Sequence, residues 1–291
     1  MKSWLIVKAN DEEMLATAAT SGAEAVVVDC GHSASPKAKA EARVAARDWT
    51  GSHREQVLAQ HKFTRWVRIS PLHDPDWRED LETVMQAGPD GLILPECTGP
   101  KQVQQLAAEI YEVEQRNGLG HMATKIIPQV GSRASDALSI KEFAEESHPR
   151  LAGLTWDARA LARSLGARRT RDGSGGFTDA MRHVRASVLL TAHARGVMAI
   201  DSAHAVVKDV EGGEVAAKAA RADGFTGMAA RHPSHVQAIN KAFQPTSDEL
   251  ADAEAICAAF ASNPSQESLP HKGQRIGQSE LARAKRLLGR D

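Results

Sequence analysis

Cysteine is scarce in this sequence, and two hallmarks of exported or membrane proteins are missing. The three cysteines, Cys30, Cys97 and Cys257, are far apart and odd in number, which excludes a disulfide framework and a CxxC metal site. No run of about 18 apolar residues is present that would span a bilayer. The chain enters an apolar segment at 4–7 without the basic region of a secretory signal. We therefore expect a cytoplasmic protein in a reducing compartment.

Net charge is also almost absent. The 291 residues include 36 Lys and Arg against 37 Asp and Glu. This balance argues against a nucleic-acid partner or a membrane surface, but it permits a local basic pocket. Hydrophobic residues make up 42% of the chain, which is enough to bury a large core in one or two domains.

Eight short apolar runs recur along the chain. Their hydrophobicity is continuous rather than alternating, which is typical of parallel strands buried on both faces. We expect strands at 4–8, 25–29, 66–70, 91–95, 125–130, 152–156, 198–201 and 226–230.

Helical patterns separate these runs, for example at 11–21, 101–117 and 135–147. Several helices end at a glycine suited to a left-handed C-cap: Gly22, Gly88, Gly196 and Gly224. Eight strand–helix units predict an α/β fold of the closed (β/α)8 TIM-barrel type rather than a doubly wound open sheet. We assign the barrel to residues 1–245.

Residues 246–291 are expected to form a C-terminal helical extension. Helices are predicted at 247–261 and 279–289, joined by a polar, proline-containing linker at 262–270. The last helix carries an apolar stripe that must be covered, formed by Leu281, Ala284, Leu287 and Leu288. We expect a homo-oligomer, most simply a trimer, with this tail at the subunit interface; the alternative is a tail docked on its own barrel.

Segment 153–167 reads GLTWDARALARSLGA, which resembles the G-L-x-F-G-A-E-D-L-A-x-x-L-G-A turn of the citrate lyase β-subunit family (the HpcH/HpaI aldolase superfamily). Further segments resemble motifs of that family in the same order: 3–10, 67–72, 91–95, 224–227 and 232–236. The resemblance implies a carbon–carbon lyase or synthase that acts on small carboxylates or acyl-CoA thioesters through a metal-bound enolate, commonly as a homotrimer.

The sequence departs from the family pattern at its acidic positions. The two carboxylates that hold Mg²⁺ in the family are replaced by Gly131 and Ala160, and the acid of the tail motif by Gly277. We therefore expect no Mg²⁺ at the family position and assign no metal ligand and no certain cofactor. After the first strand, Asp11 replaces a family arginine, so an anion stands where a CoA phosphate would approach.

The candidate site residues follow the strands, because barrel sites lie at the carboxyl ends of the strands. Arg68 matches the family's enolate-stabilising arginine, and Glu96 and Asp157 are the candidate catalytic acids. The candidate substrate-binding residues are Asp29, His32, Ser70, Gln129, Asp201 and His204.

Each candidate has a structural alternative. Glu96 could form a salt bridge with a cation such as Arg68 or Arg159, and Asp157 could be the N-cap of a helix at 158–165. His32 and His204 could be solvated or hydrogen-bonded loop residues. The basic segment 168–171 is either a solvated loop or, beside the glycine-rich segment 173–176, a phosphate-binding or lid segment without a Walker pattern.

Two functions remain open from these residues. The first is a lyase with a rearranged active site, either metal-free or with a metal at a new position where Glu96 and Asp157 replace the lost carboxylates. The second is a non-catalytic ligand-binding or partner subunit on the same barrel. The polar residues at the strand ends favour the first function, and the missing acids favour the second.

Overall fold

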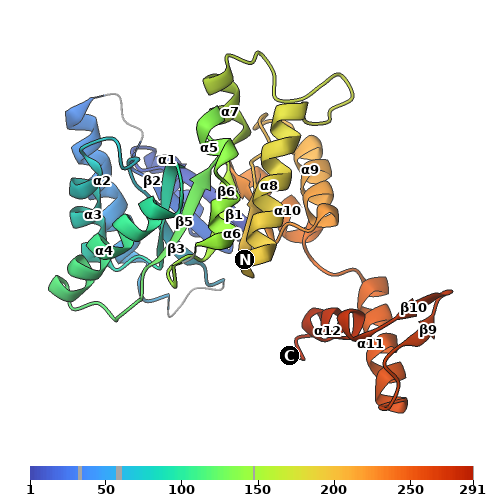
Figure 1. Cartoon of the computed structure of the whole chain (residues 1–291). Helices are drawn as coiled ribbons and strands as arrows, with labels where there is room; N and C mark the ends of the chain where they lie inside the picture. The colour runs from blue at the N-terminus through green and yellow to red at the C-terminus, as the bar shows by residue number, and fades with distance from the viewer. Residues whose placement is uncertain (32–34, 57–60, 147, 291) are drawn as a thin grey trace. The chain divides into compact units, whose positions relative to one another are not determined.

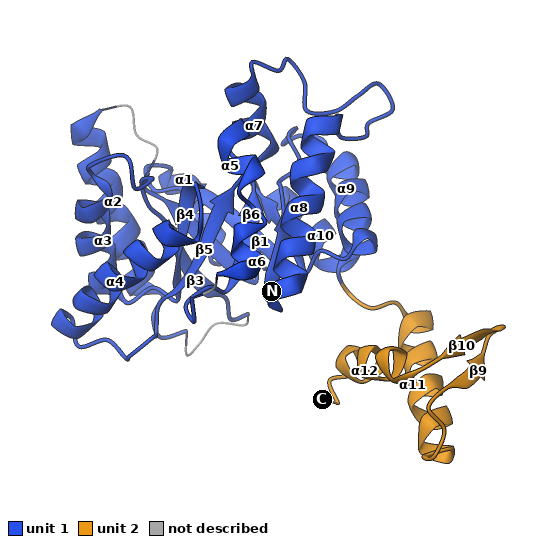
Figure 2. Cartoon of the chain, in the orientation of Figure 1, with its two compact units in different colours: residues 1–243 blue, residues 244–291 orange. Residues whose placement is uncertain are grey.

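The computed structural model describes residues 1–31, 35–56, 61–146 and 148–290, which form two compact units, Met1–Phe243 and Gln244–Asp291 (Figure 2). The first unit is a closed barrel of eight parallel strands in sequence order (Figure 1). The predicted TIM barrel is therefore confirmed. The strands are β1 (Ser3–Lys8), β2 (Ala25–Asp29), β3 (Thr64–Arg68), β4 (Gly91–Cys97), β5 (Lys125–Val130), β6 (Gly153–Trp156), β7 (Met198–Asp201) and β8 (Gly227–Ala230).

Helices surround the barrel, and their apolar faces pack on the outside of the sheet. Gly88, Gly196 and Gly224 are left-handed C-caps as predicted, with φ from 60° to 103°. The prediction is wrong for Gly22, which has φ of 79° but lies in a turn beyond the helix that ends at Ala18 and is capped by Ala19. The helices are α1 (Glu12–Ala18), α2 (Pro36–Ser52), α3 (Trp77–Val84), η1 (Met85–Ala87), α4 (Pro100–Arg116), α5 (Ala134–Leu138), α6 (Glu142–Glu145), α7 (Ala158–Leu165), α8 (Asp179–Arg195), α9 (Val210–Asp223), η2 (Pro233–His235) and α10 (Val236–Ala242).

The single helix predicted at 135–147 is wrong, because two short helices occupy that region. α5 stops at Ser139, whose hydroxyl donates to the carbonyl of Asp136 and to that of Thr98 after β4. A serine that bonds the backbone in this way competes with continuation of the helix.

Large side chains fill the inside of the barrel. Trp4 and Trp66 meet edge to face, with ring centroids 5.0 Å apart, and pack with Ile93, Ile127 and Ile200. A Cβ at Gly91 would lie 2.1 Å from the Trp66 ring, so the strand needs glycine there. This packed interior makes the barrel a core rather than a pore and leaves open space only at its ends.

The second unit is a small α/β element with its own core. It contains α11 (Ser247–Ser262), a hairpin of β9 (Leu269–His271) and β10 (Gln274–Ile276), and α12 (Gln278–Leu287). The linker expected at 262–270 is therefore wrong at its last two residues, where β9 begins. The stripe predicted on the last helix packs on Ile256, Phe260 and Ile276 of the same unit, so no second subunit is needed to cover it.

Within the part of the chain that the structure describes, no helix combines the length and the apolar character needed to cross a bilayer.

Candidate functional site

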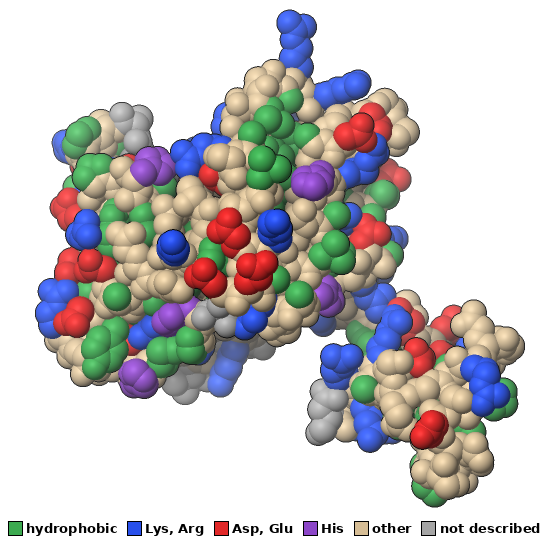
Figure 3. Space-filling model, in the orientation of Figure 1, with side chains coloured by type: hydrophobic (Ala, Val, Ile, Leu, Met, Phe, Trp, Pro, Cys, Tyr) green, Lys and Arg blue, Asp and Glu red, His purple; other side chains and the backbone are tan. Residues whose placement is uncertain are grey.

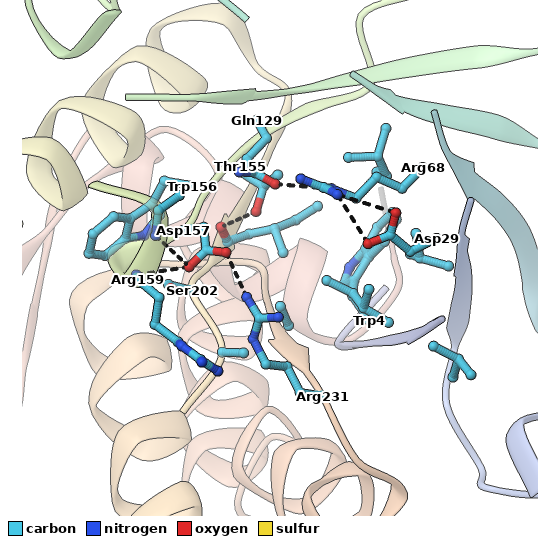
Figure 4. A pocket seen from close by; sticks show the side chains of 18 of the residues that line it. Trp4, Asp29, Arg68, Gln129, Thr155, Trp156, Asp157, Arg159, Ser202 and Arg231 are labelled. Atoms are coloured by element: carbon cyan, nitrogen blue, oxygen red, sulfur yellow. Dashed lines mark hydrogen bonds and ion pairs between the residues drawn. The ribbon is translucent and has the colours of Figure 1, made fainter. Parts of the chain in front are cut away.

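A cavity of about 410 Å³ opens where the strands end. Its floor is the interior tryptophan and isoleucine layer, and its wall is polar. Figure 4 shows the Arg68–Asp29 pair on one side of this cavity and the Asp157–Arg231 pair on the other, with Gln129 and Thr155 between them. The charged lining residues are Lys8, Asp11, Asp29, Arg68, Glu96, Asp157, Arg159, Arg163 and Arg231.

Arg68 ends β3 and is held in place from two neighbouring strands. Its Nη1 lies 3.2 and 3.0 Å from the two carboxylate oxygens of Asp29 at the end of β2, and its Nε donates to Gln129 Oε1 on β5 at 3.4 Å. Gln129 in turn donates to Ser132 Oγ at 3.3 Å. A guanidinium fixed in this way loses little side-chain freedom when a ligand binds.

Asp157 directly follows β6 and has two structural partners. Its Oδ1 accepts from the amides of Arg159 and Ala160 at 2.9 and 3.3 Å, so it is the N-cap of α7, as the structural alternative proposed. Its Oδ2 lies 2.6 Å from Arg231 Nη2. Burial alone would raise the pKa of Asp157, but Arg231 and the two amides outweigh it and hold that pKa below its ordinary value. Asp157 is therefore a fixed anion and a poor proton acceptor.

Glu96 reaches the cavity through an unusual backbone. It has φ of 50°, and the pairing of β4 with β5 shifts register between Leu94 and Cys97. Its side chain is 34% exposed, and its carboxylate lies 3.9 Å from His73 Nε2 rather than beside the expected arginines. A bulge re-aims a side chain at a cost in backbone strain, and such strain is concentrated at functional sites. Among the cavity carboxylates described, Glu96 is the one least engaged by hydrogen bonds.

Three other predicted residues do not line this cavity. Asp201 is buried and accepts from Trp156 Nε1, Arg185 Nε and the amide of Ser202, each at 2.8 Å; burial raises its pKa. Ser70 is buried, and its amide donates to Asp80. His204 bonds to Asp209 Oδ2 at 2.9 Å. His32 lies outside the described residues. The roles assigned to all of the predicted site residues stay predictions.

Comparison with known proteins identifies the fold family. The family model for HpcH/HpaI aldolase/citrate lyase matches residues 2–233. The chain belongs to this family. It is similar to the citrate lyase subunit beta-like protein of Mycobacterium tuberculosis, with 30% identity over 99% of this chain and 94% of that protein. It is also similar to the mitochondrial citramalyl-CoA lyase of Rattus norvegicus, with 27% identity over 88% of this chain and 75% of that protein.

The same likeness extends to a solved structure. M. tuberculosis CitE in complex with magnesium, acetoacetate and coenzyme A superposes with a TM-score of 0.76 at 28% identity, covering 99% of this chain and 97% of that one. That protein was solved with magnesium, so we ask whether the residues present here fit such an ion.

The described residues do not fit a magnesium ion at the family position. Gly131 has φ of 66°, and a Cβ there would lie 2.6 Å from Val184 Cγ1, so no carboxylate side chain fits without displacing the core. Ala160 lines the cavity with a methyl group. The oxygens of Asp157 are occupied by amides and Arg231, and no cluster of three or more His, Cys, Asp or Glu occurs in the described part of the chain. The two positions at which the resemblance places Mg²⁺ ligands, Gly131 and Ala160, therefore supply no carboxylate oxygen.

Three further arginines of the wall were not among the site residues predicted from sequence: Arg159, Arg163 and Arg231. Arg231 is the first residue after β8, so the rule that selected Asp157 after β6 would also have selected it. Arg159 and Arg163 are four residues apart on α7 and therefore share one face of that helix. Together with Lys8 and Arg68, these three arginines give the cavity wall five cations, against four carboxylates.

Proposed function

We propose that the cavity binds a small carboxylate or acyl thioester and cleaves a carbon–carbon bond beside its carbonyl, with guanidinium groups in place of a metal ion. The observation that carries this proposal is the pair of anchored arginines, Arg68 and Arg231, on the wall of one cavity that also contains Glu96. The similarity to citramalyl-CoA lyase and to a protein solved with acetoacetate and coenzyme A supports the substrate class.

The proposed reaction starts from a substrate with a hydroxyl group two carbons from the carbonyl. Glu96 takes the hydroxyl proton, and the hydroxyl-bearing carbon becomes the carbonyl of the first product. The bond to the carbon beside the substrate carbonyl breaks, and its electron pair forms an enolate. Arg68 donates a hydrogen bond to the enolate oxygen. A proton then returns to the carbon beside the carbonyl to give the second product. Charge stabilisation by preorganised donors is the largest catalytic term expected in such a reaction.

Arg231 is proposed to bind the carboxylate of the substrate. It is 33% exposed in its side chain and bonded to Asp157 through Nη2, which leaves other guanidinium donors for a ligand. A bidentate contact with a carboxylate would fix the hydroxyl-bearing carbon relative to Glu96.

A substrate panel tests this function. Citramalyl-CoA, malyl-CoA, citrate and 4-hydroxy-2-oxo acids are incubated with the full chain, with and without Mg²⁺ or Mn²⁺, and the released oxo acid is measured. We expect turnover of at least one substrate that the metals do not enhance. Correctly folded protein that cleaves none of them contradicts the proposal.

A second candidate function is a non-catalytic ligand-binding subunit. The loss of the two family carboxylates at Gly131 and Ala160 favours it. The oxygens of Asp157, which could replace them, are bonded to Arg231 and to the amides of Arg159 and Ala160. This alternative predicts that CoA thioesters raise the melting temperature of the protein without being consumed.

We also propose that the protein is cytoplasmic and a homotrimer, in which the unit Gln244–Asp291 acts as a lid or subunit contact. The cysteine usage supports the first assignment, and the resemblance to a family that is commonly homotrimeric supports the second.

A further inference from the structure

A second, more open cavity of about 500 Å³ adjoins the first, and its polar lining is dominated by arginine. We call it the outer arginine groove. It lies along α7 and the loop that follows, and Figure 3 shows Lys and Arg side chains standing out over this region at the top of the view. Its lining residues are Arg159, Ala162, Arg163, Ala167, Arg168, Arg169, Thr170, Arg171, Ala205 and Val206.

Four of the five arginines of this groove have no ion-pair partner among the described residues. No carboxylate is on its described lining, and no described carboxylate forms an ion pair with Arg159, Arg163, Arg168 or Arg169. Elsewhere on this barrel, exposed arginines such as Arg78 and Arg116 each pair with a glutamate. Five guanidiniums gathered around one hollow repel one another, a cost that an anionic ligand would remove.

The loop that forms part of the groove wall is held in place by specific contacts. Arg171 stacks on the Phe177 ring at 4.0 Å and donates to the carbonyl of Gly175 at 2.7 Å. Asp172 closes the loop by accepting from the amide and hydroxyl of Ser174 and the amide of Gly176. Phe177 contacts Trp156 at the end of β6, with ring centroids 5.3 Å apart. The loop is thereby tied to the rim of the first cavity.

Arg159 and Arg163 line both cavities. The outer arginine groove therefore continues from the barrel mouth, and one ligand can occupy both. Near β1, by contrast, the wall carries Asp11, which caps α1 by accepting from the amide of Met14 at 3.1 Å and places a negative charge there. Arginine forks match phosphate oxygens in geometry as well as in charge.

From this juxtaposition we infer that the outer arginine groove is a phosphoryl-binding subsite, which holds the phosphate-bearing end of a ligand whose reactive end lies in the barrel mouth. The inference deepens the proposed function and rests on it only for the identity of the reactive end. The phosphoryl group can belong to the carrier of an acyl thioester or be a separate inorganic anion, and the two sources are distinguishable.

Titration calorimetry of the full chain with coenzyme A and with inorganic diphosphate tests the inference. The groove variant is Arg168→Ala/Arg169→Ala, and the matched control is Arg78→Ala/Arg116→Ala, which removes two exposed arginines from α3 and α4. Circular dichroism and melting temperature establish that both variants fold. If coenzyme A binds and diphosphate does not, the phosphoryl group belongs to the thioester carrier. If diphosphate binds and coenzyme A does not displace it, the phosphoryl group belongs to a separate anion.

We expect at least about tenfold weaker binding of the bound probe to the groove variant, the scale of one charge-assisted contact, and wild-type affinity in the control. Equal affinity in all three proteins, or no binding of either probe to the wild type, overturns the inference. Calorimetry measures binding and needs no turnover. If no substrate is cleaved, the proposed lyase function is refuted, but the binding of the two probes still tests the phosphoryl subsite.

Discussion

Asp157 and Arg231 connect two strand ends that are 74 residues apart in sequence, with 2.6 Å between Oδ2 and Nη2. The other oxygen of Asp157 caps α7. One carboxylate therefore fixes the start of a helix and the direction of an arginine in the cavity wall. The pairing gives Asp157 a structural role in this chain, and it holds the guanidinium of Arg231 at the cavity wall.

Replacing Asp157 tests this pairing through its pH dependence. At pH 7 we expect Asp157→Asn to lower the free energy of unfolding by about 1–2 kcal/mol, because the ion pair is lost while asparagine still caps the helix. The pKa of Asp157 is depressed in the folded state, so its contribution is present above the unfolded value of about 3.9 and is lost as the pH falls through the folded value. Urea unfolding of wild type and variant at pH 7 and pH 3 measures both. A difference that grows toward low pH contradicts the pairing.

Gly131 tests whether a side chain fits at the position where the resemblance places a metal-binding carboxylate. We expect Gly131→Ala to lower the free energy of unfolding by about 2–4 kcal/mol, the sum of a left-handed backbone penalty and overpacking against Val184. Gly166 is the matched control, because its φ of 65° is almost the same but nothing lies within 4 Å of its added Cβ. Gly166→Ala should cost only about 1 kcal/mol. Equal costs at the two positions would mean that the Val184 contact is relaxed and that a side chain fits there.

The barrel was predictable from sequence, and parts of the site were not. Each buried strand, such as β2 or β5, is marked by a mainly apolar run that can be recognised from a few consecutive residues. The bond between Arg231 and Asp157 depends on two strand ends that only the closed barrel brings together. The hairpin of β9 and β10 has three residues per strand, one of them Pro270, which gives too short a pattern to recognise.

Glu96 is also only partly readable from sequence. Its position after the fourth apolar run marks it as a candidate, but the register shift between Leu94 and Cys97 that aims its side chain has no local signature. The positive φ that results is a tertiary property, because the neighbouring strands impose it.

Glu96 provides a kinetic and a thermodynamic prediction. With a substrate found in the panel, Glu96→Gln should lower kcat by about 10²-fold or more, since the amide cannot accept the hydroxyl proton. Because the backbone at Glu96 has φ of 50°, Glu96→Gly should be more stable than Glu96→Ala by about 1 kcal/mol. Steady-state kinetics and chemical denaturation measure the two effects. An unchanged kcat in Glu96→Gln removes Glu96 from the proposed mechanism.

Asp201 is expected to act on stability rather than on ligand binding. Asp201→Ala removes the acceptor of three hydrogen bonds and leaves Arg185 with Asp223 as its remaining carboxylate. We expect a loss of about 3 kcal/mol in the free energy of unfolding, the scale of breaking a buried ion pair. Ligand affinity, measured by calorimetry well below the melting temperature, should stay within about twofold. A stable variant with weakened binding would instead make Asp201 a binding residue.

The apolar stripe of the last helix no longer supports the predicted homotrimer, because Ile256, Phe260 and Ile276 cover that stripe within the unit Gln244–Asp291. A tail with its own core is able to remain folded in contact with another subunit. We expect light scattering to give about 94 kDa for a trimer of the 31.3-kDa chain at micromolar concentration. Removing residues 244–291 should lower the mass to that of a single barrel if the tail forms the subunit contact. A mass near 31 kDa for the full chain contradicts the trimer, and an unchanged trimer after truncation moves the interface to the barrel.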